Sequence, residues 1–216
     1  MNNNIPVITI DGPSGSGKST LCNIIAKKLN WYVLESGLIY RLLAMLILKN
    51  NIPIVEKNII SCLNKLNFFS FKKKNKTSKI INLQIVGEIA SKLATFSKIR
   101  KLLLIHQRNF RKLPGLIAEG RDMGTIVFPD AVIKFFLNAS LEARVDRKIK
   151  QLKTMGLSID YTELCQQLKI RDTRDQNRLI SPLYPSKDAI ILDSTNMTLS
   201  EVFERLMREI KKRYMI

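Results

Sequence analysis

The sequence reads Gly12-Pro13-Ser14-Gly15-Ser16-Gly17-Lys18-Ser19-Thr20 between an apolar run at 5–10 and a helix-like segment at 21–29. This is the G-x-x-x-x-G-K-S pattern of a P-loop, a turn whose backbone N–H groups point inward at phosphate oxygens. Glycine allows that curl because it carries no Cβ atom. We predict that Lys18 reaches the β- and γ-phosphates of a nucleotide and that Ser19 offers its hydroxyl to Mg²⁺. The strand before the loop and the helix after it disfavour the alternative, a flexible glycine turn.

Length and composition indicate one domain. The chain has 216 residues, and 45% of them are hydrophobic, which is enough for a single sizeable core. Three asparagines follow Met1, and the longest apolar run, 42–48, is far shorter than the roughly 20 residues that span a bilayer. We therefore expect a cytoplasmic protein without a signal peptide or a membrane segment.

Cysteine and histidine are too sparse for a metal or disulfide framework. Cys22, Cys62 and Cys165 are far apart and form no C-x-x-C pair, which argues against a zinc site and against disulfides. We interpret them as buried apolar thiols. His106 is the only histidine, which excludes histidine-based metal sites.

The formal net charge of +18 raises the question of nucleic-acid binding. An excess of lysine, isoleucine and asparagine is also what AT-rich coding produces. The basic run at 72–76 is interpreted as the solvated tip of a hairpin with strands at 68–71 and 79–81. The arginines differ from the lysines, because several stand beside acidic residues and so indicate fixed sites for a small phosphorylated ligand. They are Arg121, Arg171, Arg174 and Arg178.

Strands and helices alternate along the chain. Apolar runs predict five strands, at 5–10, 31–34, 116–118, 131–137 and 189–192. Helical periodicity covers 21–29, 39–49, 55–66, 84–111 with a break near Phe96-Ser97, 141–155 after a Ser140 cap, 159–178, and 199–213 after a cap at Thr198 or Ser200. This order predicts a three-layer α/β fold with a mostly parallel sheet. Ligands gather at the carboxyl ends of such strands, where Arg121-Asp122 would lie.

Four further segments carry a family resemblance. They are Glu35-Ser36-Gly37-Leu38-Ile39-Tyr40-Arg41, Ala118-Glu119-Gly120-Arg121-Asp122-Met123-Gly124-Thr125, Arg171-Asp172-Thr173-Arg174-Asp175-Gln176-Asn177-Arg178 and Ser181-Pro182-Leu183-Tyr184-Pro185-Ser186-Lys187-Asp188-Ala189. Together with the P-loop they resemble bacterial cytidylate kinases nearly from end to end. The resemblance implies transfer of the γ-phosphoryl group of ATP to CMP or dCMP, with Mg²⁺, in pyrimidine metabolism.

The resemblance also implies an organisation of the chain. It predicts a single P-loop kinase domain with a five-stranded parallel sheet and a core at 1–66, 111–147 and 179–216. A helical lid at about 148–178 and a small CMP-binding insert at about 67–110 complete it. The insert is shorter and richer in lysine than in the longer members of the family.

Individual residues receive roles from the same resemblance. Lys18, Arg121 and Arg174 are expected to be catalytic, and Ser19 is expected to hold Mg²⁺. ATP is expected to bind Gly12, Pro13, Ser14, Gly15, Ser16, Gly17, Lys18, Ser19 and Thr20. Of the CMP-binding positions, Ser36, Arg41 and Arg121 match those at the acceptor phosphate; Ser91, Arg100, Asp122 and Arg178 those around the cytosine; and Arg171 with Asp175 those at the pentose. Arg144, Arg147 and Arg174 would lie near the lid.

Several alternatives remain open from the sequence. Another small-molecule kinase, acting on UMP, AMP or shikimate, is disfavoured by the intact G-R-D-M-G-T and R-D-x-R-D segments. A nucleic-acid-binding ATPase would need aromatic residues interleaved with the basic run. The short insert suggests a third alternative, a kinase fold without turnover. The preference among CMP, dCMP and UMP is not decided. We expect a monomer that binds these nucleotides and neither nucleic acid nor membrane.

Overall fold

The computed structural model describes residues 5–65 and 84–214. The hairpin predicted at 68–71 and 79–81 lies outside these residues, as does the basic run between its strands. Within the described residues, no helix is both long and apolar enough to cross a membrane.

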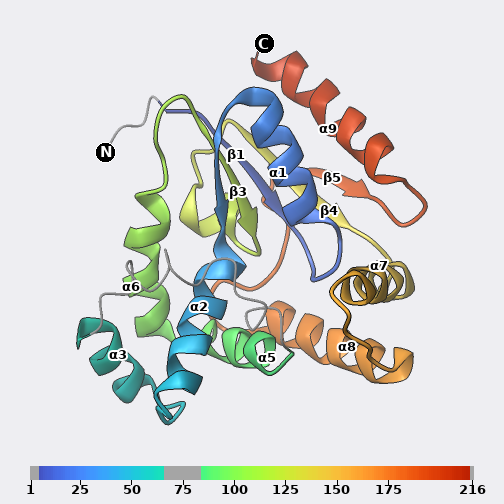
Figure 1. Cartoon of the computed structure of the whole chain (residues 1–216). Coiled ribbons are helices and arrows are strands. Elements are labelled where there is room, and N and C mark those ends of the chain that lie inside the picture. Colours follow the sequence, from blue (N-terminus) through green and yellow to red (C-terminus); the bar gives the residue numbers. More distant parts are fainter. Residues whose placement is uncertain (1–4, 66–83, 215–216) are drawn as a thin grey trace. The chain divides into compact units, whose positions relative to one another are not determined.

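A five-stranded sheet forms the middle of the α/β part of the chain (Figure 1). Its strands are β1 (Val7–Asp11), β2 (Tyr32–Glu35), β3 (Leu116–Gly120), β4 (Ile133–Asn138) and β5 (Ile190–Asp193), in the order β2-β3-β1-β4-β5. Strand β1 pairs in parallel with β3 and with β4, and β4 pairs in parallel with β5. All residues of β1 and β3 are buried, as expected for apolar runs inside a parallel sheet. The predicted five-stranded parallel sheet is confirmed.

Two helices with apolar stripes pack on this sheet. They are α1 (Lys18–Leu29) and α9 (Leu199–Tyr214), which also contact each other. Val202, Leu206 and Ile210 of α9 share a buried core with strand residues such as Ile8 and Phe135. Helix α1 begins three residues before its predicted start, because the end of the P-loop already forms the first turn.

The cap of α9 distinguishes between the two predicted candidates. Glu201 N–H donates to Thr198 Oγ1 at 3.3 Å, and Glu201 Oε2 accepts from Thr198 N–H at 2.8 Å. This reciprocal arrangement is a capping box. The cap is therefore Thr198 and not Ser200.

Helices α7 (Leu141–Thr154) and α8 (Tyr161–Asn177) pack on each other through Val145, Leu164 and Leu168. The predicted cap at Ser140 is confirmed, since its hydroxyl accepts from Ala143 N–H at 3.2 Å. The sequence did not predict the short π-helical turn η2 (Met123–Val127), which follows β3.

Helices α2 (Ser36–Lys49), α3 (Glu56–Lys65), α5 (Gln84–Leu93) and α6 (Ser97–Arg108) form a separate compact unit. Helix α2 packs against α5, and α3 packs against α6. The break predicted near Phe96-Ser97 is confirmed, because α5 ends at Leu93 and α6 begins at Ser97. Apolar faces hold this unit together, with Leu42, Val86 and Leu103 among its fully or almost fully buried residues.

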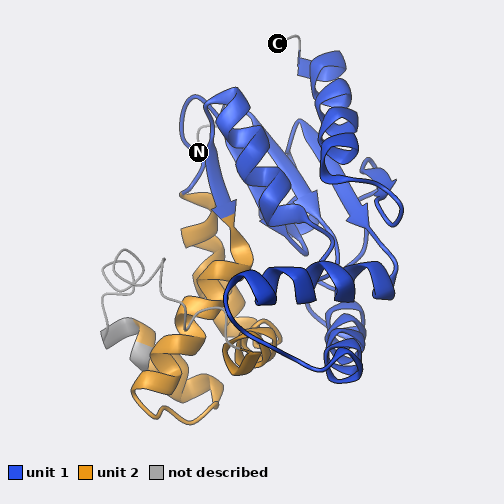
Figure 2. Ribbon diagram, turned by 45° about the vertical axis from the view of Figure 1, so that its right-hand side comes forward, with its two compact units in different colours: residues 1–34, 110–216 blue, residues 35–109 orange. Residues whose placement is uncertain are grey.

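The two compact units are residues 1–34 with 110–216, which contain the sheet, and residues 35–109 (Figure 2). We call them the sheet unit and the helical unit. The helical unit is larger than the insert expected at 67–110, part of which lies outside the described residues. Cys22 is buried in the core of the sheet unit, and Cys165 is half-buried beside the α7 and α8 cluster.

Candidate active site

The P-loop turns tightly between β1 and α1. Gly12 has a φ of 147°, and a Cβ atom there would lie 2.1 Å from the carbonyl oxygen of Leu137. Gly15 has a φ of 81°, and its Cβ would lie 3.0 Å from the carbonyl oxygen of Arg144. Both positions favour glycine because a side chain would strain the backbone there, and at Gly12 it would also collide with neighbouring main chain. The loop therefore has the shape that its sequence pattern predicted.

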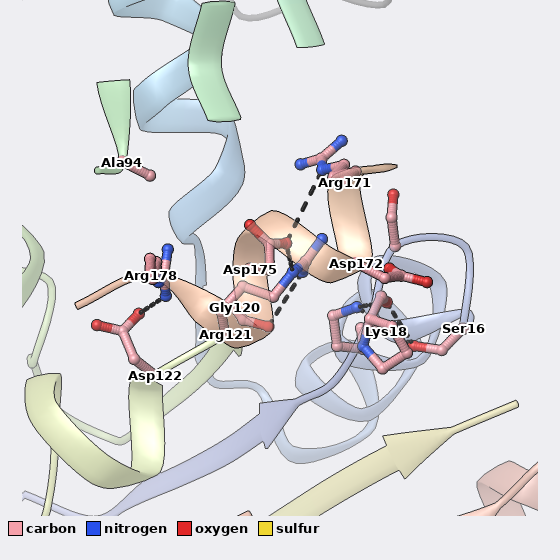
Figure 3. A network of polar contacts seen from close by, with 12 residues as sticks. Ser16, Lys18, Ala94, Gly120, Arg121, Asp122, Arg171, Asp172, Asp175 and Arg178 are labelled. Carbon is pink, nitrogen blue, oxygen red and sulfur yellow. Dashed lines mark hydrogen bonds and ion pairs between the residues drawn. The ribbon is translucent and has the colours of Figure 1, made fainter. Parts of the chain in front are cut away.

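Lys18 lies against the inside of its own loop (Figure 3). Its Nζ donates to the carbonyl oxygen of Pro13 at 2.6 Å and to Ser16 Oγ at 3.2 Å. Burial lowers the pKa of Lys18 to about 7, and Arg121 acts in the same direction, while Glu119 and Asp11 act to raise that pKa. The ammonium group thus faces acidic side chains on β1 and β3 and the guanidinium of Arg121, which directly follows β3.

Ser19 is paired with an acidic residue that the sequence analysis did not single out. Ser19 Oγ donates to Glu119 Oε1 at 2.9 Å, and Glu119 is buried on β3. Hydroxyl and carboxylate oxygens are ligands that Mg²⁺ accepts, so the pair fits the predicted metal. The signal that could have revealed Glu119 is its place at the carboxyl end of a buried strand.

Arg121 and Asp175 form an ion pair between the end of β3 and α8 (Figure 3), in which the Arg121 side chain is 15% exposed and the Asp175 side chain is 5% exposed. Arg121 Nε donates to Asp175 Oδ2 at 2.8 Å, and Arg171 Nε lies 4.0 Å from the same oxygen. Burial acts to raise the pKa of Asp175, but Arg121 and Arg171 outweigh it and hold that pKa below its ordinary value. Burial also acts to lower the pKa of Arg121, yet Asp175 keeps it above its ordinary value. Both groups therefore stay charged near neutral pH.

A second ion pair, between Arg178 and Asp122, also joins the end of α8 to the loop after β3. Arg178 Nη2 lies 4.0 Å from Asp122 Oδ1, and each side chain is only 4% exposed. Arg178 Nε also donates to the carbonyl oxygen of Ser181, and Leu183 N–H donates to that of Asp175 at 2.8 Å. The segment after α8 is thereby tied to its C-terminal end. We call Arg121, Asp122, Arg171, Asp175 and Arg178 the arginine cluster.

The three arginines expected near the lid occupy different surroundings. Arg144 is buried on α7 and donates through Nη1 to the carbonyl oxygen of Ser14 at 3.2 Å and to Asp172 Oδ2 at 2.6 Å. It thus connects the P-loop with α8. Arg147 donates to Ser194, near the end of β5. Arg174 is half-buried on α8, and its side chain makes no hydrogen bond or ion pair within residues 5–65 and 84–214.

The remaining predicted acceptor residues lie in the helical unit. Ser36 is the first residue of α2 and accepts from Gln107 Nε2 at 2.8 Å. Arg41 lies against α5, since a Cβ atom at Gly87 would be 2.9 Å from Arg41 Nη2. Arg100 on α6 donates to the carbonyl oxygen of Ala94 at 3.2 Å, with its guanidinium carbon 6.0 Å from the ring centroid of Tyr40.

Ser91 differs from these residues. Its side chain is buried on α5, and its hydroxyl makes no hydrogen bond within the described part of the chain. Within the sheet unit, by contrast, Arg121 and Arg171 face Asp175, and Arg178 faces Asp122. The predicted CMP-binding residues of the sheet unit therefore lie close to partners within the set. Those of the helical unit lie on α2, α5 and α6.

Comparisons with known proteins find cytidylate kinases. The family model described as cytidylate kinase matches residues 8–212. The cytidylate kinase of Buchnera aphidicola subsp. Baizongia pistaciae is 47% identical over 220 residues, which cover 97% of this chain and 96% of the relative. That of Proteus mirabilis is 44% identical, with coverage of 96% and 97%, and that of Erwinia tasmaniensis is 46% identical, with coverage of 92% for each.

Proposed function

The chain belongs to the cytidylate kinase family, and from that premise we propose that it transfers the γ-phosphoryl group of ATP to CMP or dCMP. The products are ADP and the corresponding nucleoside diphosphate. The observation that carries the proposal is the ion pair of Arg121 and Asp175 at the end of β3. It fixes a guanidinium whose positive charge acts to lower the pKa of Lys18. A fixed guanidinium can bind phosphate oxygens with two parallel hydrogen bonds.

ATP would bind at the P-loop, residues 12–20. The backbone N–H groups of the loop and the N-terminal end of α1 would surround the phosphates, and Lys18 would contact the γ-phosphate. Ser19 and Glu119 would hold Mg²⁺ through their oxygens, directly or through water. Bound there, Mg²⁺ would neutralise charge on the β- and γ-phosphates.

CMP would bind through arginines and small polar groups. In the sheet unit we assign Arg121 to the acceptor phosphate, Asp122 and Arg178 to the cytosine, and Arg171 with Asp175 to the pentose. In the helical unit we assign Ser36 and Arg41 to the phosphate and Ser91 and Arg100 to the base. The buried Ser91 hydroxyl supports its assignment, because a buried donor normally has a partner.

The reaction itself needs no general base. An oxygen of the acceptor phosphate is already anionic near neutral pH and attacks the γ-phosphorus, while the bond to the bridging oxygen of ADP breaks. Catalysis then consists of alignment and of neutralising the charge on the transferred group. Lys18, Arg121 and Arg174 would supply that positive charge.

Water must be excluded, because transfer to water would hydrolyse ATP without forming product. We assign this role to the lid at about 148–178, which includes all of α8 and carries Arg174. Closure of the lid would bring Arg174 to the reacting phosphates. We further propose that the protein acts as a monomer and binds no nucleic acid.

The test is ADP release in a coupled assay with ATP and Mg²⁺, offering CMP, dCMP, UMP, AMP and GMP in parallel. We expect turnover with CMP and dCMP, and a loss of about 10³-fold in Arg121→Ala. Arg208→Ala, at an exposed position of α9, is the matched control and should behave as wild type. Absence of turnover with both cytidylates would overturn the proposal.

A further inference from the structure

Asp11 is a buried carboxylate that neither the sequence motifs nor the proposed mechanism uses. It is the last residue of β1, and its side chain is almost fully buried at 5% exposure. The parallel register places Asp11 beside Gly120 of β3. It therefore lies between two loops, since Gly12 opens the P-loop and Arg121 opens the loop after β3.

Both carboxylate oxygens of Asp11 bind the loop after β3. Oδ1 accepts from Met123 N–H at 2.9 Å, and Oδ2 accepts from Gly124 N–H at 2.8 Å. These are consecutive backbone amides at the start of η2. The turn closes on the other side, where Ile126 N–H and Val127 N–H donate to the carbonyl oxygen of Asp122. Two bonds from one rigid carboxylate define both the position and the orientation of the turn.

Burial of the Asp11 carboxylate costs free energy. Burial raises the pKa of Asp11 to about 7, and Asp122 acts in the same direction, while the two backbone hydrogen bonds and Lys18 act to lower it. An apolar residue in the middle strand of a sheet would avoid that burial cost. The feature that an apolar residue could not supply is a pair of acceptors for the two amides.

We propose that Asp11 is a positioning residue that fixes Arg121 and Asp122 relative to the P-loop. Arg121 and Asp122 directly precede the two amides that Asp11 binds, so displacing the turn displaces both side chains. Asp11 itself directly precedes Gly12, so the loop that holds ATP and the loop that contacts CMP are connected through one side chain. The inference rests on the proposed function in assigning CMP to Arg121 and Asp122.

Asp11→Asn is the informative substitution, because it keeps the size of the side chain. Its amide oxygen can accept from one backbone N–H, but its NH₂ group then faces the other N–H, and two donors repel. We expect kcat/KM for CMP to fall at least about tenfold, because small misplacements of positioning groups reduce rates strongly. The KM for ATP should change by less than about threefold, since the P-loop keeps its own contacts.

Thr9→Val is the matched control. Thr9 lies two residues earlier on β1, on the same face, and is fully buried. It also touches the same turn, because a Cβ atom at Gly124 would lie 2.9 Å from Thr9 Oγ1. The Thr9 hydroxyl makes no hydrogen bond within the residues that the structure describes. Its replacement by a methyl group should therefore leave the kinetic constants of wild type.

Amide hydrogen exchange tests the anchoring without using turnover. In the wild-type protein the amides of Met123 and Gly124 should exchange slowly, and in Asp11→Asn these amides and those of Arg121 and Asp122 should exchange at least about tenfold faster. Thr9→Val should leave them slow. This readout does not depend on the substrate, so failure of the inference and failure of the proposed function can be distinguished. Fast exchange in wild type, or kinetic constants equal in the two variants, would overturn the role of Asp11.

Discussion

The P-loop and the arginine cluster are held in shape by contacts of different range. The polar contacts inside the P-loop join near neighbours, such as Lys18 with Pro13 five residues before it. In the arginine cluster, Arg121 and Asp175 are 54 residues apart in the sequence and meet only when β3 and α8 are in place. The contacts of Lys18 are therefore local, although Ser14 and Ser19 of the same loop also bind Arg144 and Glu119 from distant parts of the chain. The pair of Arg121 and Asp175 depends entirely on the finished fold.

Because of this difference, we expect mutations in the two regions to affect activity and stability differently. Removing a side chain from the P-loop should reduce activity and leave stability nearly unchanged. Removing a member of the arginine cluster should reduce both, because a buried charge then loses its partner.

The largest effect is expected for Lys18→Met. Loss of the ammonium group should lower kcat by about 10³-fold or more, because its charge stabilises the transferred phosphoryl group. The free energy of unfolding should change little, since burial already disfavours the charged form of Lys18 and lowers its pKa to about 7. Steady-state kinetics and urea unfolding measure the two quantities. Lys27→Met, at an exposed position of the same helix, serves as control, and a large loss of stability in Lys18→Met would contradict the local character of the loop.

A smaller loss of activity, accompanied by a loss of stability, is expected for Asp175→Asn. The neutral amide leaves Arg121 and Arg171 without their shared carboxylate. We expect kcat/KM for CMP to fall about 10²-fold and the free energy of unfolding to fall by about 2 kcal/mol. The control is Asp146→Asn, at an exposed position of α7. If Asp175→Asn lost activity at full stability, the two regions would not differ as we infer.

The pH dependence of stability should reveal Asp11, which lies between the two regions. Its pKa is raised from 3.8 to about 7, so between these values the folded state holds a proton that the unfolded state has lost. Stability contributed by this group therefore falls as pH rises through that window, by at most about 1.4 kcal/mol per pH unit. Other carboxylates titrate in both wild type and Asp11→Asn and cancel in the difference. Urea unfolding of both proteins from pH 4 to 8 measures it, and a difference independent of pH would contradict burial of the carboxylate.

The smallest effect is expected for a local contact outside the site. Thr198→Ala removes the capping box of α9, which joins residues three positions apart. The free energy of unfolding should fall by about 1 kcal/mol, and kcat and KM should stay at wild-type values. Thr154→Ala, near the C-terminal end of α7, removes a hydroxyl that does not cap a helix N-terminus and should have a smaller effect on stability. A kinetic defect in Thr198→Ala would show that local contacts far from the site also matter for turnover.

Much of the fold could be predicted because its signals are local. Apolar runs of strand length predicted the sheet, and the break before Ser97 separated α5 from α6. The segments with Arg121 and Asp175 also predicted acidic and basic partners in the arginine cluster. Glu119, Asp11 and the turn η2 were missed. Each acidic residue is a single carboxylate at the end of an apolar strand, and the hydrogen bonds that distinguish it come from distant parts of the chain.

The sequence by itself determined the strand and helix order, the P-loop and the family, because periodicity, turn chemistry and motif spacing act over a few residues. Only the tertiary structure decided which charges meet. It paired Arg121 with Asp175, Ser19 with Glu119, and Asp11 with the amides of Met123 and Gly124. The physical reason is that parallel strands place residues far apart in the chain at one edge of the sheet, where burial strengthens every polar contact between them.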